Sequence, residues 1–203
     1  MKKFIAALTA LFLFAGCSFA APDAAGLKKM STFLSNFTEQ GFFNFDIEAD
    51  GGDDALHLGD PSSPDLIRFG IMHNYINNFK SRIRNCAKKN CPYGSLVIDA
   101  KFVAESVKKY FDIDLKHRSV KDSDPPYHYD GKVYHFEGAD GEAVYYAEVK
   151  KAVNERGVVR MTGDIYNADD KTDRPWTFEA FAKPYKWKGK DTWSILSLRV
   201  KDR

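Results

Sequence analysis

Between Tyr127 and Val200 the sequence alternates apolar and polar residues, and turn-forming residues interrupt the alternation at short intervals. Successive side chains of a strand point to opposite faces, so this pattern is typical of half-buried strands in an antiparallel sheet. The segments that we expect to be strands are residues 127–129, 132–136, 143–153, 159–166, 176–182 and 192–200. This half of the chain constrains the fold most, because the apolar face of such a sheet needs a second layer to cover it.

Turn chemistry fixes parts of this sheet. Asp130-Gly131 lies between two β-forming segments and predicts a hairpin, because both central residues of such a turn take positive φ. Residues 143–153 fit a strand best, although a helix is an alternative. Pro184 should end its strand or leave it at an edge, because proline donates no hydrogen bond to a neighbouring strand. Residues 192–200 are apolar on both faces, which predicts a central or curved strand.

The first half of the chain has the apolar spacing of helices, three and four residues apart. Its first stripe follows an N-cap residue at Asp23 and consists of Leu27, Met30, Leu34 and Phe37. A second pattern covers residues 65–84, and a third helix is expected after Asp99. Helices followed by strands indicate an α+β fold, with N-terminal helices packed on a C-terminal twisted antiparallel sheet. This order resembles the cystatin-like and NTF2-like superfolds, which host binders, dimerisation modules and enzymes.

Residues 1–20 have the features of a bacterial secretory signal, since Lys2 and Lys3 precede an apolar run too short to span a bilayer. Cleavage after Ala20 would leave residues 21–203 as a single α+β domain. The alternative is cleavage before Cys17, because residues 14–17 resemble the lipobox of bacterial lipoproteins. That resemblance implies a lipid anchor on Cys17 and, with Ser18 after it, sorting to the outer membrane facing the periplasm. We favour the lipoprotein, with a soluble periplasmic or secreted protein as the alternative.

Cys86 and Cys91 are the thiols that remain once Cys17 is removed or acylated. Two cysteines in an oxidising compartment should pair, so we predict a disulfide between them. Their four-residue spacing is not the Cys-x-x-Cys spacing of redox sites. A zinc ion would need two further ligands, and the neighbouring sequence offers none, so we expect no metal site here.

The charge balance argues against one class of partner. Removing residues 1–20 takes Lys2 and Lys3 from 30 basic residues and leaves 28 against 28 acidic ones, a formal net charge of zero. Nonspecific nucleic-acid binding needs a clustered basic face, so we expect no nucleic-acid partner. The basic run from Lys80 to Lys89 is interpreted as a solvated helix end rather than an anion site.

His73 and Asn77 are the first candidate site residues, because a spacing of four places them on one flank of a helix. An asparagine there can orient the imidazole of a ligand-binding histidine, whereas the structural alternative is that both side chains satisfy loop backbone groups. Tyr166 is the third candidate, drawn from aromatic residues of the sheet that exceed the needs of one core. These residues suggest a nonenzymatic cell-envelope module that binds a small ligand or a protein through the open side of its sheet.

The alternative function is a small isomerase or hydrolase of the NTF2-like type, in which His73, Asp164 or Glu179 acts as general base in a conical pocket. The sequence contains no catalytic motif and implies no cofactor. At family level, the leader, the cluster at residues 73–78 and the segments 163–167 and 195–198 resemble uncharacterised bacterial exported lipoproteins.

Overall fold

A computed structural model describes residues 22–48, 56, 58–77, 79, 81–123, 126–138 and 144–203. The expected leader and Cys17 lie outside these residues. Along the described chain the elements are α1 (Ala24–Thr38), β1 (Phe45–Asp46), α2 (Pro64–Ile76), β2 (Ile83–Asn85), β3 (Leu96–Asp99), α3 (Ala100–Phe111), β4 (His128–Tyr129), β5 (Val133–Phe136), β6 (Tyr145–Glu155), β7 (Val158–Asn167), β8 (Trp176–Trp187) and β9 (Lys190–Asp202).

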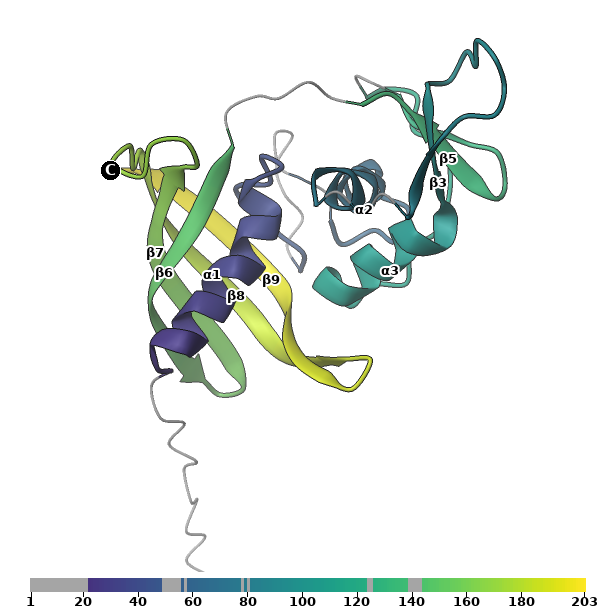
Figure 1. The fold of residues 1–203 in the computed structure, drawn as a ribbon. Coiled ribbons are helices and arrows are strands. Elements are labelled where there is room, and N and C mark those ends of the chain that lie inside the picture. Colours follow the sequence, from purple (N-terminus) through teal and green to yellow (C-terminus); the bar gives the residue numbers. More distant parts are fainter. Residues whose placement is uncertain are drawn as a thin grey trace, which may run out of the picture.

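The strands form two antiparallel sheets rather than the one sheet expected from the sequence. The larger has the order β1-β9-β8-β7-β6 and the smaller the order β2-β3-β5-β4. Helix α1 crosses one face of the larger sheet, and α2 and α3 lie between the two sheets (Figure 1). The chain therefore has an α+β fold, as predicted, but the hairpin at Asp130-Gly131 belongs to a separate sheet from β6–β9.

Helix α1 also covers an edge of the larger sheet. Asp23 caps the helix, because its carboxylate accepts the backbone N–H of Gly26 at 2.8 Å. The hydroxyl oxygens of Ser31 and Ser35 accept the backbone N–H groups of Val149 and Ala147 at 2.9 and 3.1 Å. These N–H groups belong to β6, the last strand of the sheet, so α1 satisfies an edge that would otherwise be open to pairing.

Helix α2 ends at Ile76, eight residues before the predicted end at 84. Both the backbone N–H and the side-chain amide of Asn77 donate to the carbonyl oxygen of His73, at 3.3 and 3.0 Å. The backbone N–H of Phe79 then donates to the carbonyl oxygen of Asn74 at 3.2 Å. These bonds close the helix, so Phe79, which lies within the range predicted to be helical, comes after its end.

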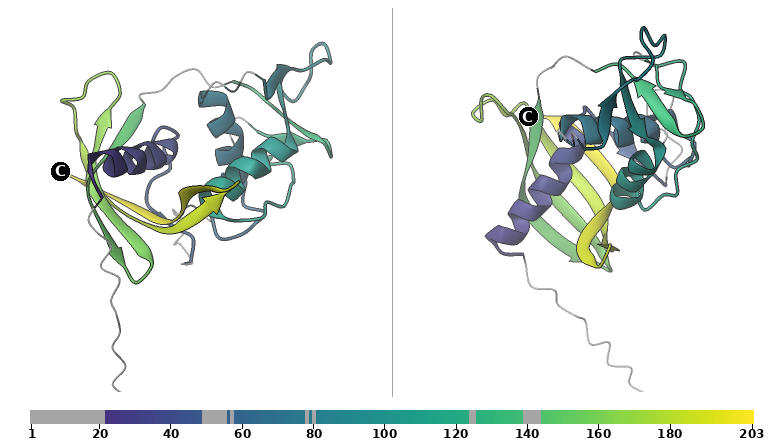
Figure 2. Two further views of the ribbon diagram at one scale, coloured as in Figure 1. Left: turned by 60° about the horizontal axis from the view of Figure 1, so that its bottom comes forward. Right: turned by 45° about the vertical axis from the view of Figure 1, so that its right-hand side comes forward.

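The long strands follow the alternating pattern closely. The segment expected at 143–153 is a strand and not a helix over its described part, which lies in β6, and β9 is central, between β1 and β8. Strand β8 continues through Pro184 to Trp187, but its pairing with β7 stops at Ala182. Pro184 therefore pairs with β9 alone, at an edge, as its missing N–H requires. Beyond this point the β8–β9 hairpin projects from the sheet beside α3 (Figure 2).

Two buried apolar clusters make up the core, and α2 contributes to both. Leu66 and Phe69 pack in the larger cluster with α1 and the five-stranded sheet. Ile67 and Ile71, on the opposite side of the helix, pack in the smaller cluster with β3 and β5. Helix α2 is therefore covered on two sides. A third flank of α2, which carries His73, lies where α2 and α3 meet the β8–β9 hairpin.

Candidate functional site: a cationic cleft beside His73

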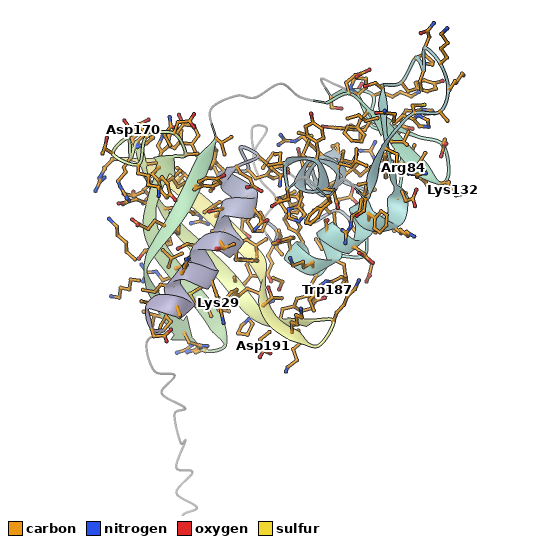
Figure 3. The ribbon with its side chains drawn as sticks, in the orientation of Figure 1. Lys29, Arg84, Lys132, Asp170, Trp187 and Asp191 are labelled. Carbon is orange, nitrogen blue, oxygen red and sulfur yellow. The ribbon has the colours of Figure 1, made fainter. Side chains whose placement is uncertain are left out.

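A cleft of about 450 Å³ lies between α2, α3 and the β8–β9 hairpin. The hairpin reaches α3 through an ion pair of 3.0 Å between Lys188 and Glu105. Trp187 and Asp191 stand on the hairpin next to α3 (Figure 3). The cleft is lined by His73, Phe79, Arg82, Glu105, Ser106, Lys109, Trp187, Lys188, Lys190, Asp191 and Thr192. It is thus assembled from parts of the chain that are far apart in sequence.

His73 is only 4% exposed, and three aromatic rings surround it. Its ring centroid lies 5.7 Å from that of Phe69, 4.8 Å from that of Tyr110 and 5.8 Å from that of Phe79. Burial, reinforced by the charges of Lys109 and Arg82, lowers the pKa of His73 to about 3. The imidazole is therefore neutral at physiological pH, and such a weakly basic ring is better suited to hydrogen bonding than to proton abstraction.

Asn77 bonds to this imidazole from the same flank of α2 and sets its tautomer. Its side-chain amide donates to Nδ1 of His73 at 3.1 Å and to Oε1 of Glu39 at 3.1 Å. Because Nδ1 accepts, the neutral ring carries its proton on Nε2. Asn74 on the same helix has the structural role instead, since its amide donates to the hydroxyl of Ser106 at 2.9 Å and fastens α2 to α3.

Lys109 supplies a partly buried positive charge. Its ammonium donates to the hydroxyl of Tyr110 at 2.9 Å and lies 4.5 Å from the centre of that ring. Burial and the neighbouring guanidinium of Arg82 lower the pKa of Lys109. Within the described residues no carboxylate lies within 4 Å of this ammonium. Lys109 is therefore a desolvated cation that an anion in the cleft would stabilise.

Arg82 is held rigidly at the same cleft. Its guanidinium donates to Oδ1 of Asn74 at 3.0 Å and forms an ion pair of 3.5 Å with Glu105. It also lies 5.0 and 4.7 Å from the ring centres of Phe79 and Phe102. The interpretation of the run from Lys80 to Lys89 as a solvated helix end is therefore wrong for Arg82, because α2 ends earlier and the chain folds back onto α3.

The charges around the cleft do not balance. Four cations line it, Arg82, Lys109, Lys188 and Lys190, against two carboxylates, Glu105 and Asp191, while His73 is neutral. Glu105 is shared between two of the cations. The exposed residue Lys186 forms an ion pair of 3.1 Å with Asp191, which partly neutralises that carboxylate. The net positive charge and the aromatic walls of Phe79 and Trp187 favour an anion that carries a flat apolar group.

Tyr166 does not join His73 and Asn77. It lies on β7 with its ring centroid 6.1 Å from that of Tyr146 and 5.4 Å from the guanidinium carbon of Arg174. Alternation along β7 places it opposite Ile165, which is buried in the core beneath α1. The aromatic surplus on which this candidate rested is largely accounted for by the two cores, in which Tyr127 and Tyr134 are buried and Tyr145, Trp176 and Trp193 are packed.

The general bases of the enzymatic alternative are also not brought together in the described structure. Asp164 lies on the outer face of β7, in an ion-pair cluster with Lys150, Arg174 and Arg203. Burial alone would raise the pKa of Asp164, but the three cations outweigh it and hold that pKa below its usual range. Glu179 faces the same side and is paired with Arg160 at 2.6 Å. These two side chains are structural ion-pair partners rather than neighbours of His73.

Cys86 and Cys91 are both free thiols in the structure, so the predicted disulfide is not formed there. Each sulfur instead lies near Nδ1 of His135, at 3.6 Å from Cys86 and 3.4 Å from Cys91. The sequence pattern could not indicate this neighbour, because His135 lies more than forty residues further along the chain.

Comparison with known proteins adds no assignment: no family model, no curated protein and no solved structure matches this chain. The resemblances to exported lipoproteins and to the cystatin-like and NTF2-like superfolds therefore stay predictions. Among the described helices, none is long and apolar enough to cross a membrane.

Proposed function

We propose that this protein is a nonenzymatic binding module that holds a small organic anion in the cleft between α2, α3 and the β8–β9 hairpin. The ammonium of Lys109 carries the proposal, because it is partly buried, faces the cleft and has no carboxylate within 4 Å among the described residues. A desolvated cation without a counterion is costly in a folded protein, and a bound anion would offset that cost. The ligand class is therefore a carboxylate or phosphate ester.

The other lining groups refine the ligand class. Nε2–H of His73 is a neutral donor that stays in place over the physiological pH range, because the pKa of about 3 keeps the ring unprotonated. The rings of Phe79 and Trp187 provide flat apolar surface for the remainder of the ligand. An aromatic or otherwise planar anion fits this arrangement better than inorganic phosphate alone.

The proposed setting follows from the leader and not from the fold. With residues 1–20 acting as an export signal, the module would meet its ligand in the bacterial cell envelope, tethered through Cys17 to the outer membrane or free in the periplasm. The cleft is small for a macromolecule, which favours a diffusible ligand over an envelope protein as the partner.

Isothermal titration of the purified protein with phenyl phosphate tests the proposal. Lys109→Met keeps the apolar stem of the side chain and removes its charge, so we expect the affinity to fall by about 10- to 100-fold, the equivalent of one charge-assisted hydrogen bond. Lys101→Met, on the same helix but outside the cleft, is the matched control and should bind like the wild type. Benzamide, which has no charge, should bind weakly to all three proteins.

Two results would contradict the proposal. One is the absence of binding of both phenyl phosphate and benzoate to the wild type. The other is an unchanged affinity in Lys109→Met, which would place any anion elsewhere on the molecule. Titration at raised salt supplies a further check, since an interaction carried by the partly buried ammonium should weaken less with salt than one carried by exposed lysines.

A further inference from the structure

A second cluster of reactive side chains lies on the four-stranded sheet, separate from the cleft. Arg84 of β2 marks this sheet in Figure 3, and Trp187 marks the cleft. Cys86 follows β2, Cys91 lies in the loop between β2 and β3, and His135 lies on β5. One ligand atom from each of the three, two sulfurs and one ring nitrogen, lies within 4.8 Å of the others.

The sheet and a close backbone contact bring these three residues together. The backbone N–H of Cys86 donates to the carbonyl oxygen of Ser95 at 2.8 Å and extends the pairing of β2 with β3. Gly94 packs directly on β5, where a Cβ atom would lie only 2.3 Å from the carbonyl of Phe136, and its φ is +130°. The loop is therefore pressed against β5 beside His135, at a position where only glycine fits without strain.

The distances match those of a shared metal ion. With metal–sulfur bonds of about 2.3 Å and metal–nitrogen bonds of about 2.05 Å, tetrahedral geometry separates a sulfur from a nitrogen ligand by about 3.6 Å. The observed distances from Nδ1 of His135 are 3.6 Å to the sulfur of Cys86 and 3.4 Å to that of Cys91. Both sulfur–nitrogen distances therefore suit a shared tetrahedral ion, and the two sulfurs lie within 4.8 Å of each other.

The second nitrogen of His135 is oriented as in known metal sites. Its Nε2 lies 3.2 Å from Oδ2 of Asp130. The other oxygen of this carboxylate, Oδ1, accepts the backbone N–H groups of Lys132 and Val133 at 2.9 and 2.8 Å. A carboxylate that receives the far N–H of a histidine fixes the tautomer in which the near nitrogen, here Nδ1, is free to bind a metal.

We propose that Cys86, Cys91 and His135 bind one thiophilic cation, Zn²⁺ or Cu⁺, with Asp130 as the group that orients His135. Two thiolates and an imidazole are the ligand set that selects these ions over Mg²⁺ or Ca²⁺. Binding releases the proton of each thiol to solvent, so the sulfurs coordinate as thiolates. Three protein ligands leave a fourth position for water or a small donor molecule.

A cavity of about 420 Å³ adjoins the cluster and is the place from which such a fourth ligand would come. Cys91 lines it together with Tyr93, His128 and Glu137. The ring of Tyr93 stacks on that of His128 with centroids 3.7 Å apart, and His128 lies 5.8 Å from His135 by the same measure. The cavity therefore opens on the metal position from the side of Cys91.

The test uses cobalt(II) as a spectroscopic probe of the reduced, metal-free protein under anaerobic conditions. We expect one equivalent of cobalt to produce thiolate-to-metal charge-transfer absorption and the intense visible bands of a tetrahedral site, and one equivalent of Zn²⁺ to remove them. Cys86→Ser, Cys91→Ser and His135→Gln should each weaken binding by at least about 100-fold. His117→Gln, which changes a histidine paired with Tyr134 outside the cluster, is the control. Cu⁺ is distinguished by a competition with a chromogenic copper(I) chelator.

Asp130→Asn tests the orienting role separately. The asparagine keeps an oxygen for the two backbone N–H groups, and its weaker interaction with His135 should lower the metal affinity by about 10- to 100-fold while the ligand set stays intact. Absence of cobalt binding in the reduced wild type would overturn the proposal. So would binding that survives His135→Gln. A third contradicting result would be a Cys86–Cys91 disulfide that forms in air, with dioxygen taking up the two thiol hydrogens, as fast with equimolar Zn²⁺ as without it.

Discussion

Replacement of Phe37 by alanine is expected to lower the free energy of unfolding by about 3–5 kcal/mol, the range for removing a large buried aromatic side chain. Phe37 is fully buried on α1, and its ring meets five others. The partners, with centroid distances of 5.2 to 6.0 Å, are Phe33, Phe45, Phe69, Tyr110 and Phe111. They come from α1, β1, α2 and α3, so one cavity would loosen all four elements. Urea unfolding followed by circular dichroism measures the change.

Phe181→Ala is the matched control, because the same ring is removed from a half-buried position on β8. Its neighbours Ala180 and Ala182 are buried in the core, so alternation directs Phe181 to the other face of the sheet. We expect less than half of the loss found for Phe37→Ala. Equal losses at the two positions would mean that the aromatic junction between the helices and the sheet does not hold the fold together.

Acidification should destabilise the wild type through His73. Its pKa is about 3 in the folded protein and near 6.5 when the chain is unfolded, so between these values the unfolded state binds one proton more. The free energy of unfolding therefore falls as pH decreases from 6.5 towards 3, by about 1.4 kcal/mol per pH unit from this group. The same contribution is fully present above pH 6.5. His73→Gln cannot take up this proton, so its stability should change much less over the same window.

The charged and titratable groups around His73 also affect the pH dependence of stability. Lys109 on α3 and Arg82 after α2 are the cations that lower the pKa of His73. Glu39, at the end of α1, is bonded to Asn77 and has a pKa raised by burial. The comparison between wild type and His73→Gln in urea, from pH 4.5 to 7.5, separates the histidine from the carboxylates, because both proteins contain the same carboxylates. Parallel slopes for wild type and His73→Gln would show that this imidazole is not buried as a neutral group.

The sequence patterns identify the secondary structure where one period dominates. The stripe of α1, its Asp23 cap and strands β6–β9 follow directly from local periodicity and capping chemistry. The hairpin at Asp130-Gly131 forms as well, but Tyr129 pairs with Tyr134 across a longer turn, in which Gly131 has positive φ and Asp130 does not. Strands β2 and β3 have three and four residues, which is too short for a periodic signal, so the second sheet could not be predicted. The end of α2 depends on hydrogen bonds made by Asn77, and apolar residues beyond it imitate a longer helix.

In the candidate sites, too, contacts between residues close in sequence could be predicted, whereas contacts made by tertiary packing could not. The pairing of Asn77 with His73 could be predicted, because both residues lie on one helix flank. Lys109 and the β8–β9 hairpin reach the cleft only through tertiary packing, and no local pattern marks them. Likewise, the spacing of Cys86 and Cys91 predicted a disulfide, and it could not show that β5 brings His135 close to both sulfurs. Tyr166 was selected from composition alone, and composition cannot tell a core aromatic from a surface one.

The most direct test of the proposed binding function is the location of the bound anion. Two-dimensional ¹⁵N–¹H spectra of the protein titrated with phenyl phosphate report it residue by residue. If the cleft is the site, chemical-shift changes should cluster at the end of α2 around His73, along α3 near Lys109 and in the β8–β9 turn at residues 187–192. Changes confined to the outer face around Tyr146 and Tyr166, or no changes at all, would contradict it.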